Sequence, residues 1–225
     1  MQLTDATDAL SLTRQMIDIP SVSGEEGPLA DAVEAALRGA GFGSVDTLEI
    51  LRDGDAVCAR THLGLPQRVV LAGHLDTVPI AENVPGRLEV RDGVEVVWGR
   101  GSVDMLGGCA AALALACEAG ALIRGGAREA LTADVTWIFY DHEEVASHFN
   151  GLGRIQRLYP QWLAGDLALL GEPTAAHDEG GCNGTLRVIA HFPGCAAHSA
   201  RAWLGSNALP ATAPVIERSA DFGPP

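Results

Sequence analysis

The sequence has little positive charge, and its basic residues are scattered. It holds 15 Lys and Arg residues against 29 Asp and Glu residues, a formal net charge of −14, and no two basic residues are adjacent. Proteins that bind nucleic acid normally show a basic patch or stripe, so we predict no nucleic-acid partner. The acidic residues could instead be ligands of metal ions.

Cysteine pairs, long apolar segments and a leader are also lacking. The five cysteines are an odd number and form no CxxC motif, so free thiols in a reducing compartment are expected rather than disulfides or a zinc ribbon. We find no apolar run of about 18 residues and no basic start followed by an apolar segment. The sequence therefore predicts a cytoplasmic protein without a membrane partner.

Strand-like and helix-like segments alternate along most of the chain. RVVLAG and VTWIFY are continuous apolar runs, typical of strands buried on both faces. The alternation predicts an α/β fold with a sheet covered by helices. We expect helices at 5–19, 28–40, 103–120 and 151–163, strands at 57–61, 68–73, 135–140 and 167–173, and a hairpin at 88–98.

The pattern changes after Pro173. A polar loop precedes residues 185–192, which alternate like a half-exposed strand. We therefore predict two domains, residues 1–177 and 178–225. The proline-rich end of the chain shows no final strand or helix, so the chain is expected to be cut off.

Polar residues follow the apolar run that ends at Gly73 and precede the next helix. His74 and Asp76 are two residues apart on an extended chain, so their side chains point the same way. Asp76 could fix the tautomer of a metal-bound His74, or the two could be ordinary polar residues at a strand end. Asp104 could bridge two metals or simply cap a helix.

Acidic residues also follow the other two buried strands. Glu143 and Glu144 come directly after VTWIFYDH, and Glu172 follows LALLG. One acid of the pair could bind a metal while the other acts as a general base on water. Alternatively, each of these acids taken alone could be an ordinary solvent-exposed residue of a turn. Mixed histidine and carboxylate ligands suit zinc, cobalt or manganese.

The segments GHLDTVP, GRGSVDMLGG, the Glu143-Glu144 pair and GEPT, in this order and spacing, resemble the co-catalytic zinc amidohydrolases. This family includes aminoacylases, glutamate carboxypeptidases and succinyl-diaminopimelate desuccinylases. The resemblance runs from IPSVSGEE to HSARAWLGSNAL, and this last segment, together with GCNGTLRV, looks most like the desuccinylases. It implies a mixed-sheet catalytic domain that is incomplete at its C-terminal end, followed by the start of an inserted α+β lid and dimerisation domain.

The resemblance also implies two divalent metals, zinc or cobalt. His74 and Glu172 would bind the first metal, Glu144 the second, and Asp104 would bridge both. Asp76 would support His74. No histidine after the lid's first segment matches the family's last ligand of the second metal, and we considered four substitutes: His142, His148, His177 and His191.

The implied reaction is hydrolysis of an amide bond in a small N-acylated amino acid, most like N-succinyl-LL-2,6-diaminopimelate. Glu143 would be the general base. His198, reaching the partner subunit of a homodimer, would stabilise the oxyanion, and Arg201 and Asn207 would contact the substrate. Leu106 replaces the lysine that usually follows DM in the second motif.

The sequence leaves three other functions as alternatives. An acetylornithine deacetylase-like enzyme would use the same residues on another acyl group. A non-catalytic remnant would explain the missing histidine. A nucleotide or phosphate binder is disfavoured, because WGRGSVDMLGG has neither the P-loop Lys-Ser/Thr nor the GxGxxG spacing.

Overall fold

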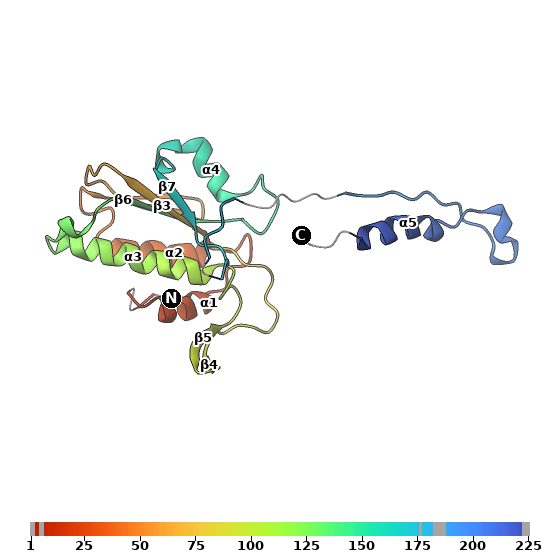
Figure 1. The fold of residues 1–225 in the computed structure, drawn as a ribbon, viewed down its shortest axis with the longest axis horizontal. Helices are drawn as coiled ribbons and strands as arrows, with labels where there is room; N and C mark the ends of the chain where they lie inside the picture. Colours follow the sequence, from red (N-terminus) through yellow and green to blue (C-terminus); the bar gives the residue numbers. More distant parts are fainter. Residues whose placement is uncertain (1–2, 5–6, 176, 182–187, 222–225) are drawn as a thin grey trace. The chain divides into compact units, whose positions relative to one another are not determined.

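The structure is a computed structural model that describes residues 3–4, 7–175, 177–181 and 188–221. The chain divides into two compact units, residues 1–178 and 179–225 (Figure 1). The first unit contains all the strands of the main sheet and all the buried apolar side chains of the described chain.

The first unit is built on a five-stranded mixed sheet with the strand order β1-β2-β6-β3-β7. Strand β2 runs antiparallel to both its neighbours, whereas β6, β3 and β7 are parallel. The strands are β1 (Leu48–Asp53), β2 (Ala56–Thr61), β3 (Arg68–His74), β6 (Asp134–Tyr140) and β7 (Leu167–Leu170). Because parallel strands end at the same edge, residues that follow β3, β6 and β7 are brought together there.

Helices cover both faces of this sheet (Figure 1). One face packs against α2 (Gly27–Gly39) and α3 (Leu106–Arg124), with α1 (Ala9–Ile17) packed on α3, and the other face packs against α4 (Gly151–Leu158) and η2 (Pro160–Trp162). Alternate side chains of β6 enter different cores: Trp137 joins the first and Ile138 the second. The predicted α/β fold with a helix-covered mixed sheet is therefore confirmed.

Helix α3 is the one element that, among the described residues, is long and apolar enough to cross a membrane. This differs from the expectation that no such run occurs. The helix packs against β3, β6, α1 and α2, and a Cβ on Gly120 would lie 2.5 Å from the carbonyl oxygen of Ala40. Its small apolar residues thus allow close packing in the core of this unit.

Several boundaries differ from the sequence prediction. Helix α3 begins at Leu106 rather than 103 and continues to Arg124, and strand β1 was not predicted. The expected hairpin is present as β4 (Arg87–Arg91) and β5 (Val94–Trp98). The segment 151–163 forms α4 and η2 instead of one helix, because Pro160 cannot continue it. A 3-10 turn, η1 (Arg128–Ala130), precedes β6.

The second unit contains η3 (Ser199–Leu204) and α5 (Leu209–Ala220). The expectation of a tail without a helix was wrong, because Pro210 fits the first turn of a helix, where its missing N–H is no loss. Pro214 lies inside the same helix. Of the expected strand at 185–192, residues 185–187 lie outside the described residues and 188–192 form no strand.

Asp134, at the start of β6, connects this strand to the end of β2 and to the loop that follows β2. The residue is 3% exposed, and its carboxylate accepts hydrogen bonds from Thr61 Oγ1 (2.7 Å), the Leu63 N–H (2.8 Å) and the Leu65 N–H (3.1 Å). Burial alone would raise the pKa of Asp134, but these hydrogen bonds and the charge of Arg68 outweigh it and lower the pKa. Folding therefore favours the ionised carboxylate.

Replacing Asp134 with asparagine should lower the free energy of unfolding at pH 7 by about 2–3 kcal/mol, because a buried acceptor of several hydrogen bonds is lost. A lowered pKa gives stability that is present above about pH 4 and is lost as the pH falls further. The difference between the two proteins should shrink there. Urea unfolding at several pH values measures it, with exposed Asp46→Asn as the control. Equal destabilisation at pH 7 and pH 3 would contradict the prediction.

Candidate metal centre

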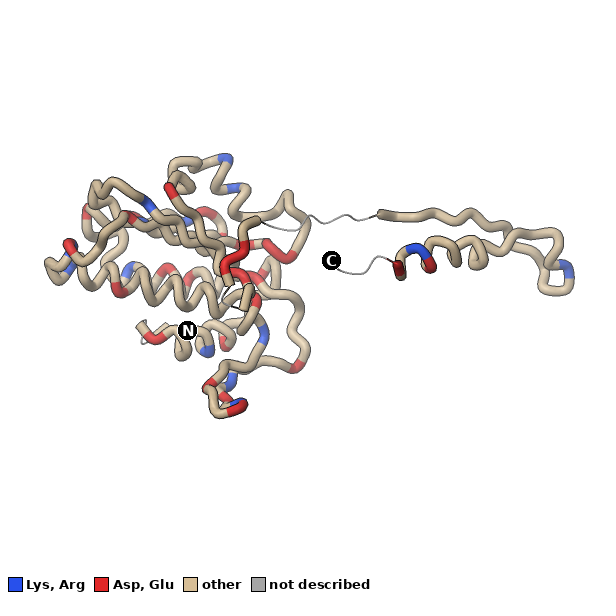
Figure 2. The backbone as a smooth tube through the Cα atoms, viewed as in Figure 1, with Lys and Arg blue, Asp and Glu red and all other residues tan. Residues whose placement is uncertain are grey.

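The register of the parallel strands gathers the predicted residues at one edge of the sheet. His74, the last residue of β3, pairs with Tyr140, the last residue of β6, and Ala72 pairs with Leu170 at the end of β7. The next residues, 141–144 and 172, therefore leave the sheet beside His74. Asp and Glu residues, drawn red in Figure 2, gather at this end.

His74 lies at the centre of this group and is 1% exposed. Its Nδ1 is 2.9 Å from the carbonyl oxygen of Asp76, and its Nε2 is 3.2 Å from Asp104 Oδ1 and 4.0 Å from Glu172 Oε2. With its proton on Nδ1, the ring donates to the carbonyl and turns the Nε2 lone pair toward two carboxylates. Lone pairs that converge in this way need a cation or a proton between them.

Two sets of potential ligand atoms meet here, and within each set the atoms lie within 4.8 Å of one another. The first set is His74, Asp104 and Glu172, and the second is His74, Glu143 and Glu144. The first matches the ligands predicted for one metal. His74 is common to both sets, whereas the sequence prediction gave the bridging position to Asp104.

The electrostatics of the group favour a bound cation. Burial alone would lower the pKa of His74, but the carbonyl of Asp76 and the surrounding carboxylates outweigh it and raise the pKa. Burial also raises the pKa of Glu144, assisted by the charge of Asp104, and burial raises the pKa of Glu172 despite the nearby imidazole. Imidazole nitrogens and carboxylate oxygens are ligands that zinc accepts, so the residues present fit a divalent metal.

Asp104 reaches this group from the loop before α3. The N-cap position of α3 is Met105, without a side-chain cap, so the helix-capping alternative is not what the described residues show. A Cβ on Gly108 would lie 2.4 Å from the carbonyl oxygen of Gly171. Glycine at this position therefore allows the first turn of α3 to approach the end of β7, which brings Asp104 and Glu172 together.

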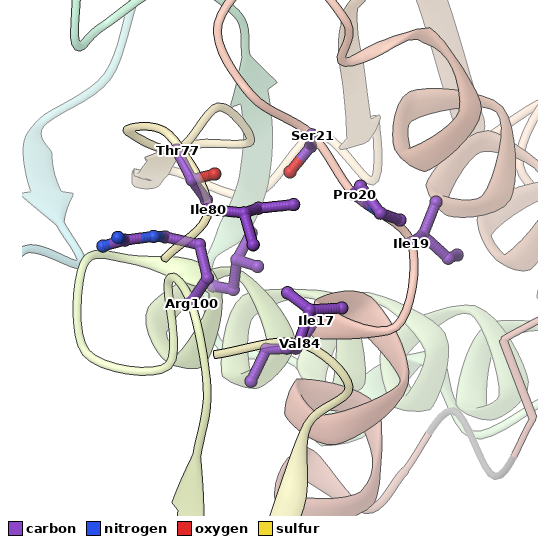
Figure 3. A pocket seen from close by; sticks show the side chains of 9 residues that line it. Ile17, Ile19, Pro20, Ser21, Thr77, Ile80, Val84 and Arg100 are labelled. Carbon is purple, nitrogen blue, oxygen red and sulfur yellow. The ribbon is translucent and has the colours of Figure 1, made fainter. Parts of the chain in front are cut away.

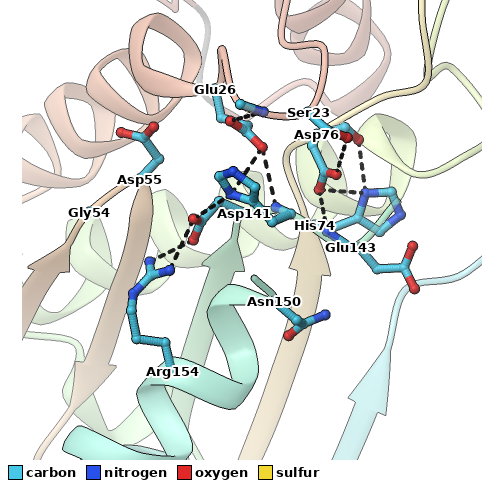
Figure 4. Close-up of polar contacts among 12 residues, drawn as sticks. Ser23, Glu26, Gly54, Asp55, His74, Asp76, Asp141, Glu143, Asn150 and Arg154 are labelled. Atoms are coloured by element: carbon cyan, nitrogen blue, oxygen red, sulfur yellow. Dashed lines mark hydrogen bonds and ion pairs between the residues drawn. The ribbon is translucent and has the colours of Figure 1, made fainter. Parts of the chain in front are cut away.

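Asp76 is fully buried, and its carboxylate binds the turn that carries the two glutamates (Figure 4). Its Oδ1 accepts from the Glu143 N–H (2.9 Å), and its Oδ2 accepts from the Glu144 N–H (3.0 Å) and Ser23 Oγ (2.7 Å). The same carboxylate is 3.5 Å from His74 Nδ1. Asp76 therefore contacts His74 mainly through its backbone carbonyl, and the glutamate turn through its side chain.

Two residues that the sequence analysis assigned no role belong to this group. Ser23 donates to Asp76, and the fully buried Glu26 accepts from the His142 N–H at 3.2 Å. Both lie in the motif IPSVSGEE, which carried part of the resemblance but gave no sign of what its acids contact. Nothing in local spacing predicts contacts across 53 and 116 residues.

The remaining predicted residues are not in these two sets. His142, His148, His177 and His191, considered as substitute ligands, join neither set of described residues. His198, Arg201 and Asn207 lie in the second unit and are exposed. The Nδ1 of His198 accepts from the Ala200 N–H (3.2 Å), and the Asn207 side chain accepts from the Leu209 N–H (3.0 Å).

A small pocket lies between α1, the β3–β4 loop and the start of α3 (Figure 3). It is lined mainly by apolar side chains, with Ser21, Thr77 and Arg100 as polar members. Its cavity volume of about 10 Å³ is what one water molecule needs. The pocket is therefore too small for an acyl amino acid.

The fold and the cluster define an α/β protein with a candidate two-metal centre at the carboxyl ends of its parallel strands. The chain belongs to the peptidase family M20/M25/M40, whose sequence profile matches residues 70–203. A tripeptidase from Staphylococcus aureus has a similar fold, with a TM-score of 0.63 at 16% identity over 96% of this chain and 57% of that one.

Curated relatives share much more sequence. The succinyl-diaminopimelate desuccinylase of Corynebacterium glutamicum is 46% identical over 221 residues, which cover 96% of this chain and 55% of the relative. A Mycobacterium tuberculosis protein provisionally assigned the same activity is 49% identical over 215 residues, 96% of this chain and 56% of the relative. The chain thus spans a little more than half the length of these relatives.

Proposed function

We propose that this chain supplies the metal centre and the general base of an enzyme that hydrolyses the amide bond of N-succinyl-LL-2,6-diaminopimelate to succinate and LL-diaminopimelate. The observation that carries the proposal is that His74 forms two sets of potential ligand atoms, one with Asp104 and Glu172 and one with Glu143 and Glu144, and that within each set the atoms lie within 4.8 Å of one another. The substrate is inferred from the relatives that share 46–49% identity.

In this proposal His74, Asp104 and Glu172 would hold one metal. Glu144 would hold the second together with Asp104, a role for Asp104 that rests on the sequence resemblance, because Asp104 is absent from the second set of ligand atoms. Zinc or cobalt fits these nitrogen and oxygen ligands. Metal ions bound here would polarise the amide carbonyl and lower the pKa of a water molecule from 15.7 to about 7. The carbonyl of Asp76, 2.9 Å from His74 Nδ1, keeps Nε2 available as a ligand.

Glu143 is the proposed general base. Its backbone N–H is fixed by Asp76 (2.9 Å), whereas its side chain makes no hydrogen bond to a described residue and is partly exposed. The carboxylate can therefore accept a proton from the attacking water. As the C–N bond breaks, it returns this proton to the leaving amine, which yields a carboxylate and an amine.

The second unit supplies the other proposed contacts. We place His198 of the partner subunit at the oxyanion and Arg201 and Asn207 at the substrate carboxylates, in a homodimer formed through residues 178–225. Their support is the sequence resemblance and their exposure. The domain boundary at 177/178 and the cytoplasmic location stay predictions.

Metal content and substrate choice test the proposal together. The purified chain is loaded with zinc or cobalt, bound metal per chain is measured, and N-succinyl-LL-2,6-diaminopimelate and N-acetylornithine are offered to wild type and Glu143→Ala. Two metals and succinate release that needs Glu143 support the proposal. Faster release of acetate would replace it with the acetylornithine deacetylase-like activity. Metal binding without turnover above Glu143→Ala would show that this chain alone is not a catalyst.

A further inference from the structure

In the turn after β6, three successive backbone N–H groups point at two buried carboxylates that belong to other segments. The His142 N–H donates to Glu26 Oε1 (3.2 Å), and the Glu144 N–H donates to Asp76 Oδ2 (3.0 Å). The Glu143 N–H between them donates to Asp76 Oδ1 (2.9 Å) (Figure 4). The acceptors come from segments far away in the sequence. The direction in which the two glutamate side chains leave this turn is thus set from outside the turn.

Both carboxylate oxygens of Glu26 accept hydrogen bonds from backbone N–H groups. Its Oε2 accepts from the Gly24 N–H (2.8 Å), while its Oε1 serves His142. The side chain is fully buried, and a buried carboxylate is costly unless hydrogen bonds compensate it. A glutamine could offer only one acceptor oxygen here, and its NH₂ group would face a second N–H.

The turn itself needs support. His142 has a φ of 60°, a left-handed conformation that costs a residue with a Cβ free energy. Its Nδ1 lies 2.8 Å from Asp141 Oδ2 and 3.5 Å from Glu26 Oε1. The contacts of Glu26 and Asp141 hold His142 in this conformation, which determines where Glu143 begins.

The loop that carries Glu26 is fixed in turn to the end of β3. The Thr77 N–H donates to the Ser21 carbonyl (2.9 Å), and the Ser23 N–H donates to the Thr77 carbonyl (3.1 Å). Ser23 Oγ also donates to Asp76. Glu26 and Asp76 therefore stand on one connected frame when they hold the turn.

We propose that Glu26 is a positioning residue that locks the His142 turn and thereby aims Glu143 and Glu144 into the metal centre. This inference rests on the proposed function for the meaning of those two side chains. It does not require Glu26 to contact a metal or a substrate. It predicts that a change at Glu26 acts on the metal held by Glu144 more than on the metal held by His74 and Glu172.

The test compares Glu26→Gln with Glu25→Gln, because Glu25 is the adjacent glutamate and is exposed. In metal-free protein, hydrogen exchange at the amides of residues 142–144 should become faster in Glu26→Gln only. Metal titration should show the site of Glu144 lose affinity by about 10- to 100-fold, as is typical when a residue behind a ligand is changed. The kcat should fall while KM changes little.

A shorter acid separates geometry from charge. Glu26→Asp keeps both oxygens but cannot reach Gly24 and His142 at once, so it should show an intermediate loss, and it decides the matter if Glu26→Gln does not fold. The proposal would be overturned if Glu26→Gln had the same hydrogen exchange at residues 142–144 and the same metal affinity as the wild type. It would also be overturned if Glu26→Asp matched the wild type in both measurements. Failure of the proposed function would be seen in the wild type, as no bound metal or as no turnover above Glu143→Ala, while the exchange measurement would still report on Glu26.

Discussion

Replacing Glu143 with glutamine should lower the turnover of N-succinyl-diaminopimelate by about 10²–10⁴-fold, the usual contribution of a general base. Bound metal per chain should stay at the wild-type level. The reason is chemical: glutamine keeps the shape of the side chain but cannot take a proton. The free energy of unfolding should hardly change, because the side chain of Glu143 makes no hydrogen bond to a described residue and its N–H still reaches Asp76.

The adjacent Glu144 makes this test sharper. Glu144→Gln should lower the metal content first and the turnover as a consequence, whereas Glu143→Gln should lower the turnover alone. Glu118→Gln, a change on the exposed side of α3, controls for the loss of one negative charge. Metal analysis, urea unfolding and initial rates on all three variants measure the difference. Loss of a metal from Glu143→Gln would show that Glu143 is a ligand, as its place in the second set allows.

The part of the centre that lies at strand ends could be predicted from sequence. RVVLAG and VTWIFY are continuous apolar runs, which identify buried parallel strands, and the polar residues that follow such strands meet at one edge. His74, the Glu143-Glu144 pair and Glu172 were located by this reasoning. Asp104 needed the added condition that glycines at 108 and 171 allow α3 to approach β7.

The support behind the ligands could not be predicted in this way. Glu26 contacts a turn 116 residues away. Its position depends on the packing of α2 against the sheet and on the hydrogen bonds between residues 21–23 and Thr77. The two roles of Asp76 could not be predicted either. Its backbone carbonyl contacts His74, whereas its carboxylate accepts hydrogen bonds from the glutamate turn. Local spacing predicted that Asp76 assists His74, but not which of its groups does so.

The second unit shows where composition misleads. Its prolines suggested an end without regular structure, yet residues 209–220 form α5. Pro210 is pre-arranged for a first helical turn. The apolar side chains of α5 are exposed in this unit, with Leu209 at 73% and Ile216 at 63%. The described residues of this unit bury no apolar side chain, so a pattern of apolar residues gives little information on its helices.

Asp76 is the residue whose loss should disturb the centre most broadly. Its carboxylate accepts three hydrogen bonds, from Ser23, Glu143 and Glu144, inside a fully buried site. Removing one partner of a buried charged network leaves donors unpaired and costs about 3–5 kcal/mol in comparable cases. The same bonds fix the backbone that carries the proposed base and one proposed ligand.

Asp76→Asn should therefore lower the free energy of unfolding by about 2–4 kcal/mol, abolish measurable turnover and weaken metal binding. Ser23→Ala is the matched control, because it removes one of the three donors and no charge, so a loss of about 1 kcal/mol and a smaller effect on turnover are expected. Urea unfolding of metal-free protein separates the stability effect from metal binding, which a titration then measures. If the carboxylate of Asp76 acts only on His74, Asp76→Asn would weaken the metal bound by His74 and Glu172 and leave hydrogen exchange at 143–144 unchanged. If it holds the turn, that exchange becomes faster and the metal bound by Glu144 is weakened most.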